Sequence, residues 1–308
     1  MAVVCHDAGG TEVISAYIKG RPDLYEYRVF AGGPAGEIFA RKGIKIAQIF
    51  EEGQHWIANL FAGNRVNAVL TSIDWSSDLT ARVRREAKKK GIYTIVYLDH
   101  WVYYRERLGY PQQGWEAALP DEFWAGDDYS LKLAKELFPS TKVRLEPNLY
   151  FEEVKEDFRR YLLENKKSLA ANSLLFISEP ISATNNVFGA TAHPTTNEYS
   201  VLKNLLDALA ETNFNKRVLI RFHPSEKPDK YNDLLVRYRG KLIIGKSFGK
   251  SIYGDLMVSS VVVGMESMAL VIALLCGKKV MSLLPDCSLP FPEIEKVQSA
   301  KKLATMVA

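Results

Sequence analysis

Residues 260–284 read SVVVGMESMALVIALLCGKKVMSLL, and this stretch decides the fold. The apolar run at 260–263 predicts a buried strand, and the segment at 266–276, which is apolar from Ala269 onward, predicts a helix. Gly277 ends that helix, because glycine readily adopts the left-handed backbone that closes many helices. Residues 280–284 predict the next strand. A strand, a helix and a strand in this order indicate a unit with two parallel strands.

The same alternation of strand and helix extends from this stretch over the rest of the chain. Further strands are predicted in the second half at residues 174–178, 217–222 and 242–244. The first half has predicted strands at residues 2–5, 27–31, 45–50, 68–73, 93–98, 122–125 and 142–145. Most of these runs are continuously apolar, as strands are when helices cover both faces of a parallel sheet. The predicted fold class is therefore α/β.

The length and one charged segment predict two domains. The chain has 308 residues, which suits two domains of about 150 residues each. Residues 152–167 are highly charged and helix-prone, which predicts a connecting helix and a linker, with the boundary at residues 166–172. We expect an N-terminal domain over residues 1–167 and a C-terminal domain over residues 168–308, facing each other across a ligand cleft.

The composition narrows the class of protein. Hydrophobic residues make up 47% and charged residues 25% of the chain, which are the values of a folded globular protein. The net charge of +4 is too small to indicate a nucleic-acid partner. Among three cysteines, Cys5 and Cys276 lie in apolar runs, which favours buried thiols in a reducing compartment.

Neither a signal peptide nor a membrane span is predicted. The N-terminus lacks a basic stretch followed by a long apolar core, and the longest apolar run is too short to cross a bilayer. We therefore expect a cytoplasmic protein.

The turn at residues 6–10 is the first candidate site. In open parallel sheets, ligands bind outside the carboxyl ends of the strands, and this turn follows the first strand. Gly9 and Gly10 permit close approach of the backbone to a ligand, and Asp7 supplies a carboxylate. The turn lacks the GxGxxG pattern of dinucleotide-binding proteins, and a tight turn without function explains it equally well.

Acidic residues follow several other strands of the first half. Glu52 and Asp99 could each act as a general base, as could Asp7. His100 and the aromatic residues at 101–104 accompany Asp99, and aromatic faces with polar partners suit sugars. Solvated loop residues or an aromatic cluster at the edge of a domain are the alternatives, and the sequence does not choose among the three acids.

In the second half, Ser267 opens the helix of the quoted stretch. Free backbone N–H groups at a helix start bind anions, and a serine hydroxyl adds a donor, so a phosphate fits here. Glu266 lies beside Ser267, and Glu179 lies at the end of another strand, so both are included in this candidate nucleotide site. The alternative is that Ser267 or Glu266 only caps the helix.

Arg221, His223 and Pro224 form a second candidate for binding phosphate. Arg221 and His223 share one face of the strand, because side chains alternate along it. The histidine, fixed by Pro224, could donate to a phosphate or ribose oxygen. The alternative is a histidine that only bonds a carbonyl of its own loop.

Metal-dependent and serine-hydrolase chemistry are weakly supported. The sequence contains no HExxH motif and no DxD triplet, and GMES at 264–267 lacks the second glycine of the GxSxG elbow. We expect no metal and no cofactor.

Together the second-half motifs resemble a known family group. An RxHP strand end, a strand followed by GxES and a helix, and then GKKV with a final strand look like the donor-nucleotide domain of GT-B-fold glycosyltransferases. The likeness is greatest to sialyltransferase-like and CDP-glycerol glycerophosphotransferase-like enzymes of bacterial surface polysaccharide biosynthesis. It implies two Rossmann-like domains and a nucleotide phosphate held by His223, Pro224 and Ser267. The acidic-acidic-glycine motif of the sialyltransferase-like members matches residues 51–53, which implies Glu52 as base.

The sequence departs from related families in the helix at 266–276. Many GT-B enzymes have a glutamate that binds ribose about five residues before the closing glycine, and that position is Ile272 here. The non-hydrolysing UDP-GlcNAc 2-epimerases place two glutamates where this chain has Val271 and Ile272.

The resemblance implies transfer of a sugar, or a related phospho-polyol, from a nucleotide-activated donor to an acceptor hydroxyl on a glycan or a lipid-linked acceptor. Such enzymes need no spanning helix, so a peripheral contact with the inner membrane face is an alternative to a purely cytoplasmic location. A nucleotide-sugar epimerase of the same fold, and a non-catalytic nucleotide- or sugar-binding protein, are the rival functions. The oligomeric state is left open.

Overall fold

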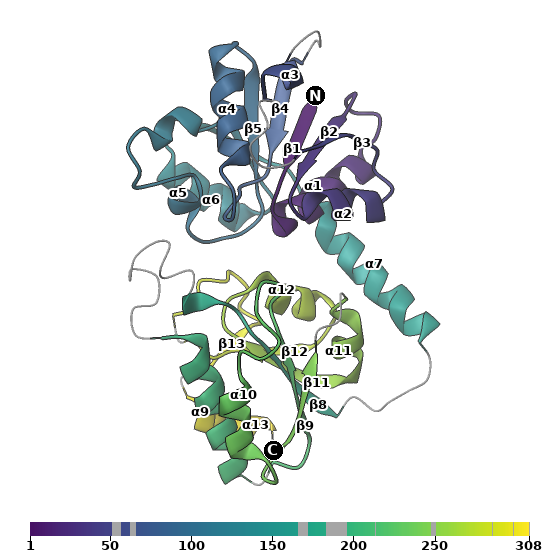
Figure 1. Cartoon of the computed structure of the whole chain (residues 1–308), viewed down its shortest axis with the longest axis vertical. Coiled ribbons are helices and arrows are strands. Elements are labelled where there is room, and N and C mark those ends of the chain that lie inside the picture. The colour runs from purple at the N-terminus through teal and green to yellow at the C-terminus, as the bar shows by residue number, and fades with distance from the viewer. Residues whose placement is uncertain are drawn as a thin grey trace. The chain divides into compact units, whose positions relative to one another are not determined.

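The computed structural model describes residues 1–50, 57–61, 66–165, 172–182, 196–212, 214–247, 251–284, 286–297 and 299–307. Two compact units, Met1–Glu153 and Val154–Ala308, are called unit 1 and unit 2 below (Figure 1). The helix α7 (Leu149–Glu164) spans the division between them. The boundary predicted at residues 166–172 lies, apart from Asn172, outside the described residues. The predicted ligand cleft between the domains stays a prediction.

Unit 1 contains a seven-stranded parallel sheet with the order β3-β2-β1-β4-β5-β6-β7. Its strands are β1 (Ala2–Cys5), β2 (Arg28–Gly32), β3 (Ile46–Phe50), β4 (Ala68–Thr71), β5 (Tyr93–Leu98), β6 (Glu122–Ala125) and β7 (Lys142–Leu145). Each of them overlaps a predicted strand. The parallel α/β class is therefore confirmed for this half of the chain.

Helices cover both faces of the unit 1 sheet. They are α1 (Ala8–Gly20), α2 (Ala35–Arg41), α3 (Ile57–Phe61), α4 (Leu79–Lys89), α5 (Tyr104–Arg107) and α6 (Asp128–Leu137). Along β1, Val3 and Cys5 belong to the core that includes α1 and α2, whereas Ala2 and Val4 belong to the core that includes α3 and α4. Because neighbouring side chains of a strand point to opposite faces, β1 has to be apolar at every position.

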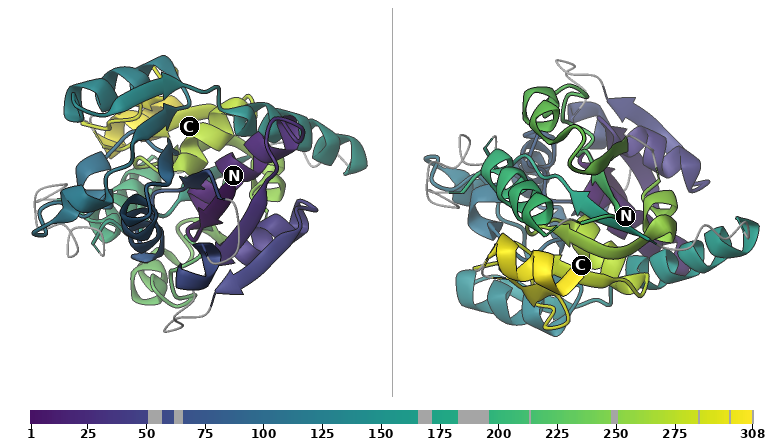
Figure 2. Two further views of the ribbon diagram at one scale, coloured as in Figure 1. Left: turned by 90° about the horizontal axis from the view of Figure 1, so that it is seen from above. Right: turned by 90° about the horizontal axis from the view of Figure 1, so that it is seen from below.

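Unit 2 contains a six-stranded parallel sheet with the order β10-β9-β8-β11-β12-β13. Its strands are β8 (Ser173–Ile177), β9 (Arg217–Arg221), β10 (Ile243–Ser247), β11 (Ser259–Gly264), β12 (Lys279–Ser282) and β13 (Glu295–Lys296). Its helices are α9 (Glu198–Glu211), α10 (Asn232–Leu235), α11 (Tyr253–Val258), α12 (Met268–Leu275) and α13 (Ala300–Val307). The terminal helix α13 lies beside α9 (Figure 2).

Two helix starts differ from the sequence-based expectation. Helix α1 begins at Ala8, so Gly9 and Gly10, which were expected in the turn at residues 6–10, form the first turn of the helix. A Cβ at Gly10 would lie 2.4 Å from the Cβ of Ser72, so the close packing of this turn against the end of β4 requires glycine there. Helix α12 begins at Met268, not Glu266, and Ser267 is its N-cap.

Other findings concern two short elements and the burial of individual side chains. The six-residue helix α11 and the two-residue strand β13 were not predicted, because segments this short carry no readable period. Helix α4 buries one charged residue, since Arg84 is 1% exposed and donates to the carbonyl of Ala118. Cys5 is buried as expected, whereas Cys276 is only partly buried.

Candidate functional site

The strand orders bring two turns together in each unit. In unit 1 the chain runs from β1 outward to β3 and then returns to β4 on the other side of β1. Unit 2 repeats this path with β8, β10 and β11. The crevice at such a reversal is the place where open α/β sheets bind ligands. The turns after β1 and β4, and those after β8 and β11, are therefore the first places to examine.

In unit 2, the two predicted acids fix the turn that precedes α12. Glu179, which follows β8, accepts a hydrogen bond from the backbone N–H of Glu266 at 3.0 Å. The carboxylate of Glu266 is buried and accepts from the backbone N–H of Ser288 at 3.2 Å. Both side chains thus lie at the predicted edge of the sheet. Their observed contacts hold the backbone around the start of α12.

Ser267 is the polar group of this turn whose contacts are incomplete. As N-cap of α12 it has extended backbone, but its hydroxyl makes no capping hydrogen bond. Its Oγ is buried and has no hydrogen-bond partner. A buried hydroxyl without a partner costs about 1–3 kcal/mol, so it is rarely kept without a reason. An oxygen of a ligand at the start of α12 would satisfy both this hydroxyl and the free N–H groups of the first turn.

His223 lies in the loop after β9, and its contacts define which ring nitrogen carries the proton. The backbone N–H of Ser225 donates to Nδ1 at 3.2 Å, so Nδ1 is an acceptor and the proton of the neutral ring is on Nε2. The Ser225 hydroxyl lies 2.7 Å from Nδ1. Partial desolvation by the surrounding protein lowers the pKa of His223, Lys230 lowers it further, and Glu226 opposes the change. His223 is therefore a neutral Nε2–H donor at neutral pH.

Arg221 and Pro224 lie on either side of this histidine. Arg221 at the end of β9 forms an ion pair of 2.7 Å with Asp255, which is on the unpredicted helix α11. Asp255 also accepts a hydrogen bond from Ser247 at the end of β10. The positive charge of Arg221 is thus balanced within the fold, while Pro224 is exposed beside His223.

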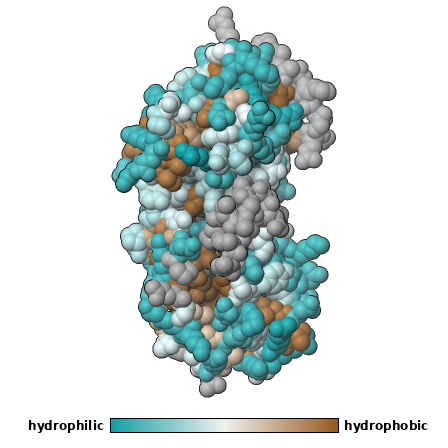
Figure 3. Space-filling model, turned by 90° about the vertical axis from the view of Figure 1, so that its left-hand side faces the viewer, coloured by the Kyte–Doolittle hydropathy of each residue, from teal (hydrophilic) through white to brown (hydrophobic). Residues whose placement is uncertain are grey.

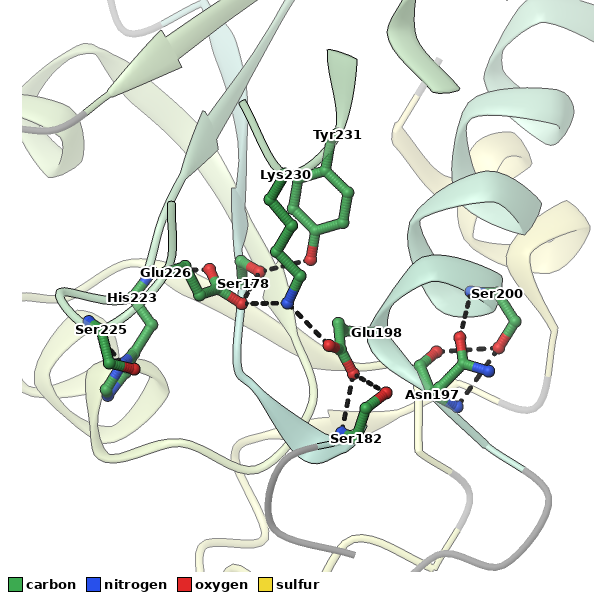
Figure 4. Close-up of polar contacts among 10 residues, drawn as sticks. All are labelled: Ser178, Ser182, Asn197, Glu198, Ser200, His223, Ser225, Glu226, Lys230 and Tyr231. Atoms are coloured by element: carbon green, nitrogen blue, oxygen red, sulfur yellow. Dashed lines mark hydrogen bonds and ion pairs between the residues drawn. The ribbon is translucent and has the colours of Figure 1, made fainter. Parts of the chain in front are cut away.

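A group of charged residues around the His223 loop was not predicted. Lys230 Nζ lies 2.6 Å from the carboxylates of both Glu198 and Glu226 (Figure 4). Glu226 in turn accepts from the backbone N–H of His223 and from the hydroxyl of Ser178. The spacing of four residues between Glu226 and Lys230 was visible in the sequence, but Glu198 is 32 residues away and only the fold brings it here.

In unit 1, the carboxylate of Asp7 accepts several hydrogen bonds from the turn after β4. It accepts from the backbone N–H groups of Trp75 at 2.5 Å and Ser76 at 3.1 Å, and from the Ser76 hydroxyl. Burial alone would raise the pKa of Asp7, but the hydrogen bonds from His6, Ser76 and Trp75 outweigh it and lower the pKa to about 2. Asp7 is ionised at neutral pH and is a weak base.

Asp74 and Asp99 are two buried carboxylates of the same edge. Burial and the nearby charge of Asp7 raise the pKa of Asp74, which accepts from Ser72 Oγ at 2.9 Å. Burial also raises the pKa of Asp99, and the ion pair with Arg107 at 3.2 Å opposes this change. A Cβ at Gly9 would lie 2.8 Å from Asp99 Oδ2, so Asp99 borders the exposed first turn of α1.

His100 and the predicted aromatic residues divide between core and surface. Burial lowers the pKa of His100 to about 3, and its Nδ1 has no hydrogen-bond partner, so the ring is neutral. Trp101 and Tyr104 are buried and serve the core. Tyr103, in contrast, is partly exposed and lies 6.0 Å from the ring of Trp75, which the sequence did not suggest.

Glu52, the third candidate base, lies outside the described residues. Among the residues that the structure describes, no group of three or more histidine, cysteine, aspartate or glutamate side chains is placed to hold a metal ion.

No family model matches the sequence, and no curated protein matches it. Solved structures do match. A UDP-GlcNAc 2-epimerase from Methanocaldococcus jannaschii aligns with 99% of this chain and 90% of its own, at 12% identity and a TM-score of 0.68. A glycosyltransferase from Rickettsia africae aligns with 99% of this chain and 86% of its own, at 12% identity and a TM-score of 0.59.

MurG from Acinetobacter baumannii also matches, covering 99% of this chain and 90% of its own at 12% identity and a TM-score of 0.52. The chain has a GT-B-like fold. This confirms the two Rossmann-like domains that the resemblance implied. Identities of 12% show the shared fold alone, so the reaction has to be argued from the site.

Within the described part of the chain, no helix has the length and apolar character needed to cross a membrane. The face drawn in Figure 3 is mostly hydrophilic, and its hydrophobic residues gather in a few separate patches.

Proposed function

We propose that the chain binds a nucleotide-activated sugar, or a related phospho-polyol donor, at the carboxyl edge of the unit 2 sheet and transfers the activated group to an acceptor hydroxyl. One observation carries this proposal. The buried, unpartnered hydroxyl of Ser267 lies at the start of α12, and the Nε2–H donor of His223 lies at the same edge of the sheet.

These groups suit the phosphates of a nucleotide. The strands β9 and β11 lie on either side of β8, so their ends are separated by about 10 Å, twice the spacing of neighbouring strands. A diphosphate with its attached sugar is long enough to contact both ends. When the bond to the sugar breaks, negative charge grows on the leaving phosphate, and the helix start, the hydroxyl and the imidazole N–H would stabilise it.

We assign the acceptor base to Asp99 among the described acids. A base works best when its pKa lies close to the working pH, and burial raises the pKa of Asp99. The pKa of Asp7 is about 2 and its oxygens are used by the turn at Trp75 and Ser76, so Asp7 is better suited to holding that turn. Glu52 stays a rival candidate for the base.

A nucleotide-sugar 2-epimerase is the second candidate, favoured by the TM-scores of 0.68 and 0.65 with two such enzymes. It would use the same nucleotide site. Against it, Val271 is fully buried and Ile272 is aliphatic at the positions where the epimerases resembled by this chain carry glutamates. A protein that binds a nucleotide or sugar without turnover is the third candidate.

Calorimetric titration with UDP, CDP, GDP and CMP tests the shared step. We expect at least one of them to bind, and Ser267→Ala to weaken its binding. Ser260→Ala, near the start of β11 and so at the opposite end of the strand that leads to Ser267, is the matched control and should leave the affinity unchanged. No binding of any nucleotide at millimolar concentration would exclude the donor site.

The nucleotide that binds then selects the sugar donors for a turnover assay. Incubation of the protein with a donor, followed by NMR, separates the three candidate functions. Release of the nucleotide that depends on an added acceptor supports transfer. Formation of an isomeric donor without an acceptor supports epimerisation. Binding with neither reaction supports the non-catalytic alternative.

A further inference from the structure

The loop that carries His223 is anchored by one carboxylate. Glu226 Oε2 accepts the backbone N–H of His223 at 2.9 Å, and Oε1 accepts the hydroxyl of Ser178 at 2.9 Å (Figure 4). Ser178 follows β8 and also contacts the hydroxyl of Tyr231 at 2.6 Å. The loop after β9 is thereby tied to the neighbouring strand at the edge where the nucleotide is proposed to bind.

Lys230 joins this anchor to α9. Its Nζ lies 2.6 Å from Glu226 Oε1 and 2.6 Å from Glu198 Oε1, and the three side chains are 11%, 3% and 3% exposed. The rings of Tyr199 and Tyr231 have centroids 5.2 Å from the same Nζ. Glu198 also accepts from the backbone N–H and hydroxyl of Ser182. Burying three charged side chains costs desolvation free energy, which is offset only where the charges pair closely and their hydrogen bonds are satisfied, as they are here.

We propose that Glu226 and Lys230 are positioning residues that hold the His223 loop so that Nδ1 accepts from Ser225 and Nε2–H is available to the ligand. This inference rests on the proposed role of His223 in nucleotide binding. Neither residue needs to touch the nucleotide. Glu226 fixes the backbone of the histidine, and Lys230 fixes Glu226 and balances its charge.

The charge balance explains why both residues are needed. Glu226 alone, bonded to the backbone of His223, would favour an imidazolium ring and raise its pKa, while Lys230 lowers it and desolvation acts in the same direction. An imidazolium has N–H groups at both nitrogens, so its Nδ1 could no longer accept the backbone N–H of Ser225. The other charged or titratable groups of this cluster are Glu198 and Tyr199 on α9 and Tyr231.

Imidazole NMR of the free protein tests the inference without a ligand. The chain has five histidines, and His223→Gln identifies the signal of His223. In the wild type we expect a neutral ring with the proton on Nε2. Lys230→Met should raise the pH at which His223 titrates, because Glu226 is no longer balanced, and Glu226→Gln should lower it, because the nearby anion is lost. Lys203→Met removes a lysine paired at 2.6 Å on α9 and should leave the titration unchanged.

Opposite shifts are what a merely structural role does not produce. If both variants only loosened the loop, His223 would titrate close to the ordinary histidine value of about 6.5 in each, and the inference would be wrong. Because Lys230→Met leaves two buried carboxylates facing each other, the double variant Lys230→Met/Glu198→Gln provides a second test with the local charge kept. It too should raise the titration point, and a fall would overturn the inference.

Nucleotide titration of the same variants separates this inference from the proposed function. If the shifts appear and no nucleotide binds to the wild type, the positioning role holds and the proposed function fails. If a nucleotide binds through His223 and the shifts are absent, the proposed function holds and the positioning role fails. We expect both Lys230→Met and Glu226→Gln to bind the nucleotide roughly tenfold more weakly, the loss of about one hydrogen bond to a charged group.

Discussion

At its carboxyl edge the unit 1 sheet holds the carboxylates of Asp7, Asp74 and Asp99, whereas the unit 2 sheet holds the hydroxyl of Ser267 and the Nε2–H of His223. In both sheets the order of the strands reverses in the same way, and in both a helix begins beside the point of reversal. Acids lie at both helix starts, Asp7 and Asp99 at α1 and Glu179 and Glu266 at α12. The start of α12 adds the buried hydroxyl of Ser267, which has no hydrogen-bond partner and can support the anion-binding tendency of a helix start. A shared topology therefore fixes where a ligand binds, and the side chains decide its charge.

The largest expected effect tests the acidic edge. Asp99→Asn removes the proposed base with little change of shape, and the transfer rate should fall by about 10²–10⁴-fold while nucleotide affinity is unchanged. Rate assays and calorimetry on the same preparation measure both quantities. A comparable loss of nucleotide affinity would contradict the proposal that the unit 1 edge supplies the base and the unit 2 edge binds the nucleotide.

His100, buried in unit 1, should make the folded protein less stable in acid. The pKa of His100 is about 3 when folded and about 6.5 when unfolded, so below pH 6.5 the unfolded chain binds a proton that the folded chain refuses. Stability should thus fall by up to about 1.4 kcal/mol per pH unit as the pH drops from 6.5 towards 3. Urea unfolding at pH 7.5 and pH 5 should show a smaller loss in His100→Leu than in the wild type. An equal loss in both proteins would mean that His100 takes up a proton in the folded state.

The donor-rich edge is tested by His223→Gln. Glutamine can still donate a hydrogen bond but cannot keep the geometry of the ring, so the affinity for the nucleotide should fall by about tenfold. His6→Gln in unit 1 is a control with the same change of residue type. The comparison between the edges gains support if only the change in unit 2 affects calorimetric affinity.

The smallest effect concerns Ser267 and has opposite signs for binding and stability. Ser267→Ala removes a buried hydroxyl that has no partner, so the free protein should become more stable by roughly 0.5–1 kcal/mol. Nucleotide affinity should fall by a few-fold in the same variant. Thermal unfolding with and without nucleotide measures both effects, and a destabilised free protein would contradict the contacts described for Ser267.

The sequence predicted the candidate residues better than their partners. The predicted positions of Ser267, Glu179 and His223 after strands or at a helix start are confirmed, because such positions can be recognised from local patterns, whereas their role in binding stays a prediction. Arg221 was expected to face a phosphate, yet it pairs with Asp255 on a helix too short to recognise. The partly exposed pair of Trp75 and Tyr103 was also missed, because the two residues are 28 positions apart, one after β4 and the other after β5, and only the fold brings their rings together.

By itself the sequence determined the α/β class, the strands of both sheets apart from the two-residue β13, and the positions where polar residues follow those strands, since these depend on local runs of apolar residues. Only the tertiary structure decided which acids are engaged, which histidine nitrogen carries its proton and which hydroxyl is left without a partner. Those properties depend on burial and on contacts between residues far apart in the chain, such as Lys230 with Glu198, or Asp7 with the turn at Trp75. Hydrogen bonding and desolvation set the chemistry of a side chain, and both are created when the sheet is assembled.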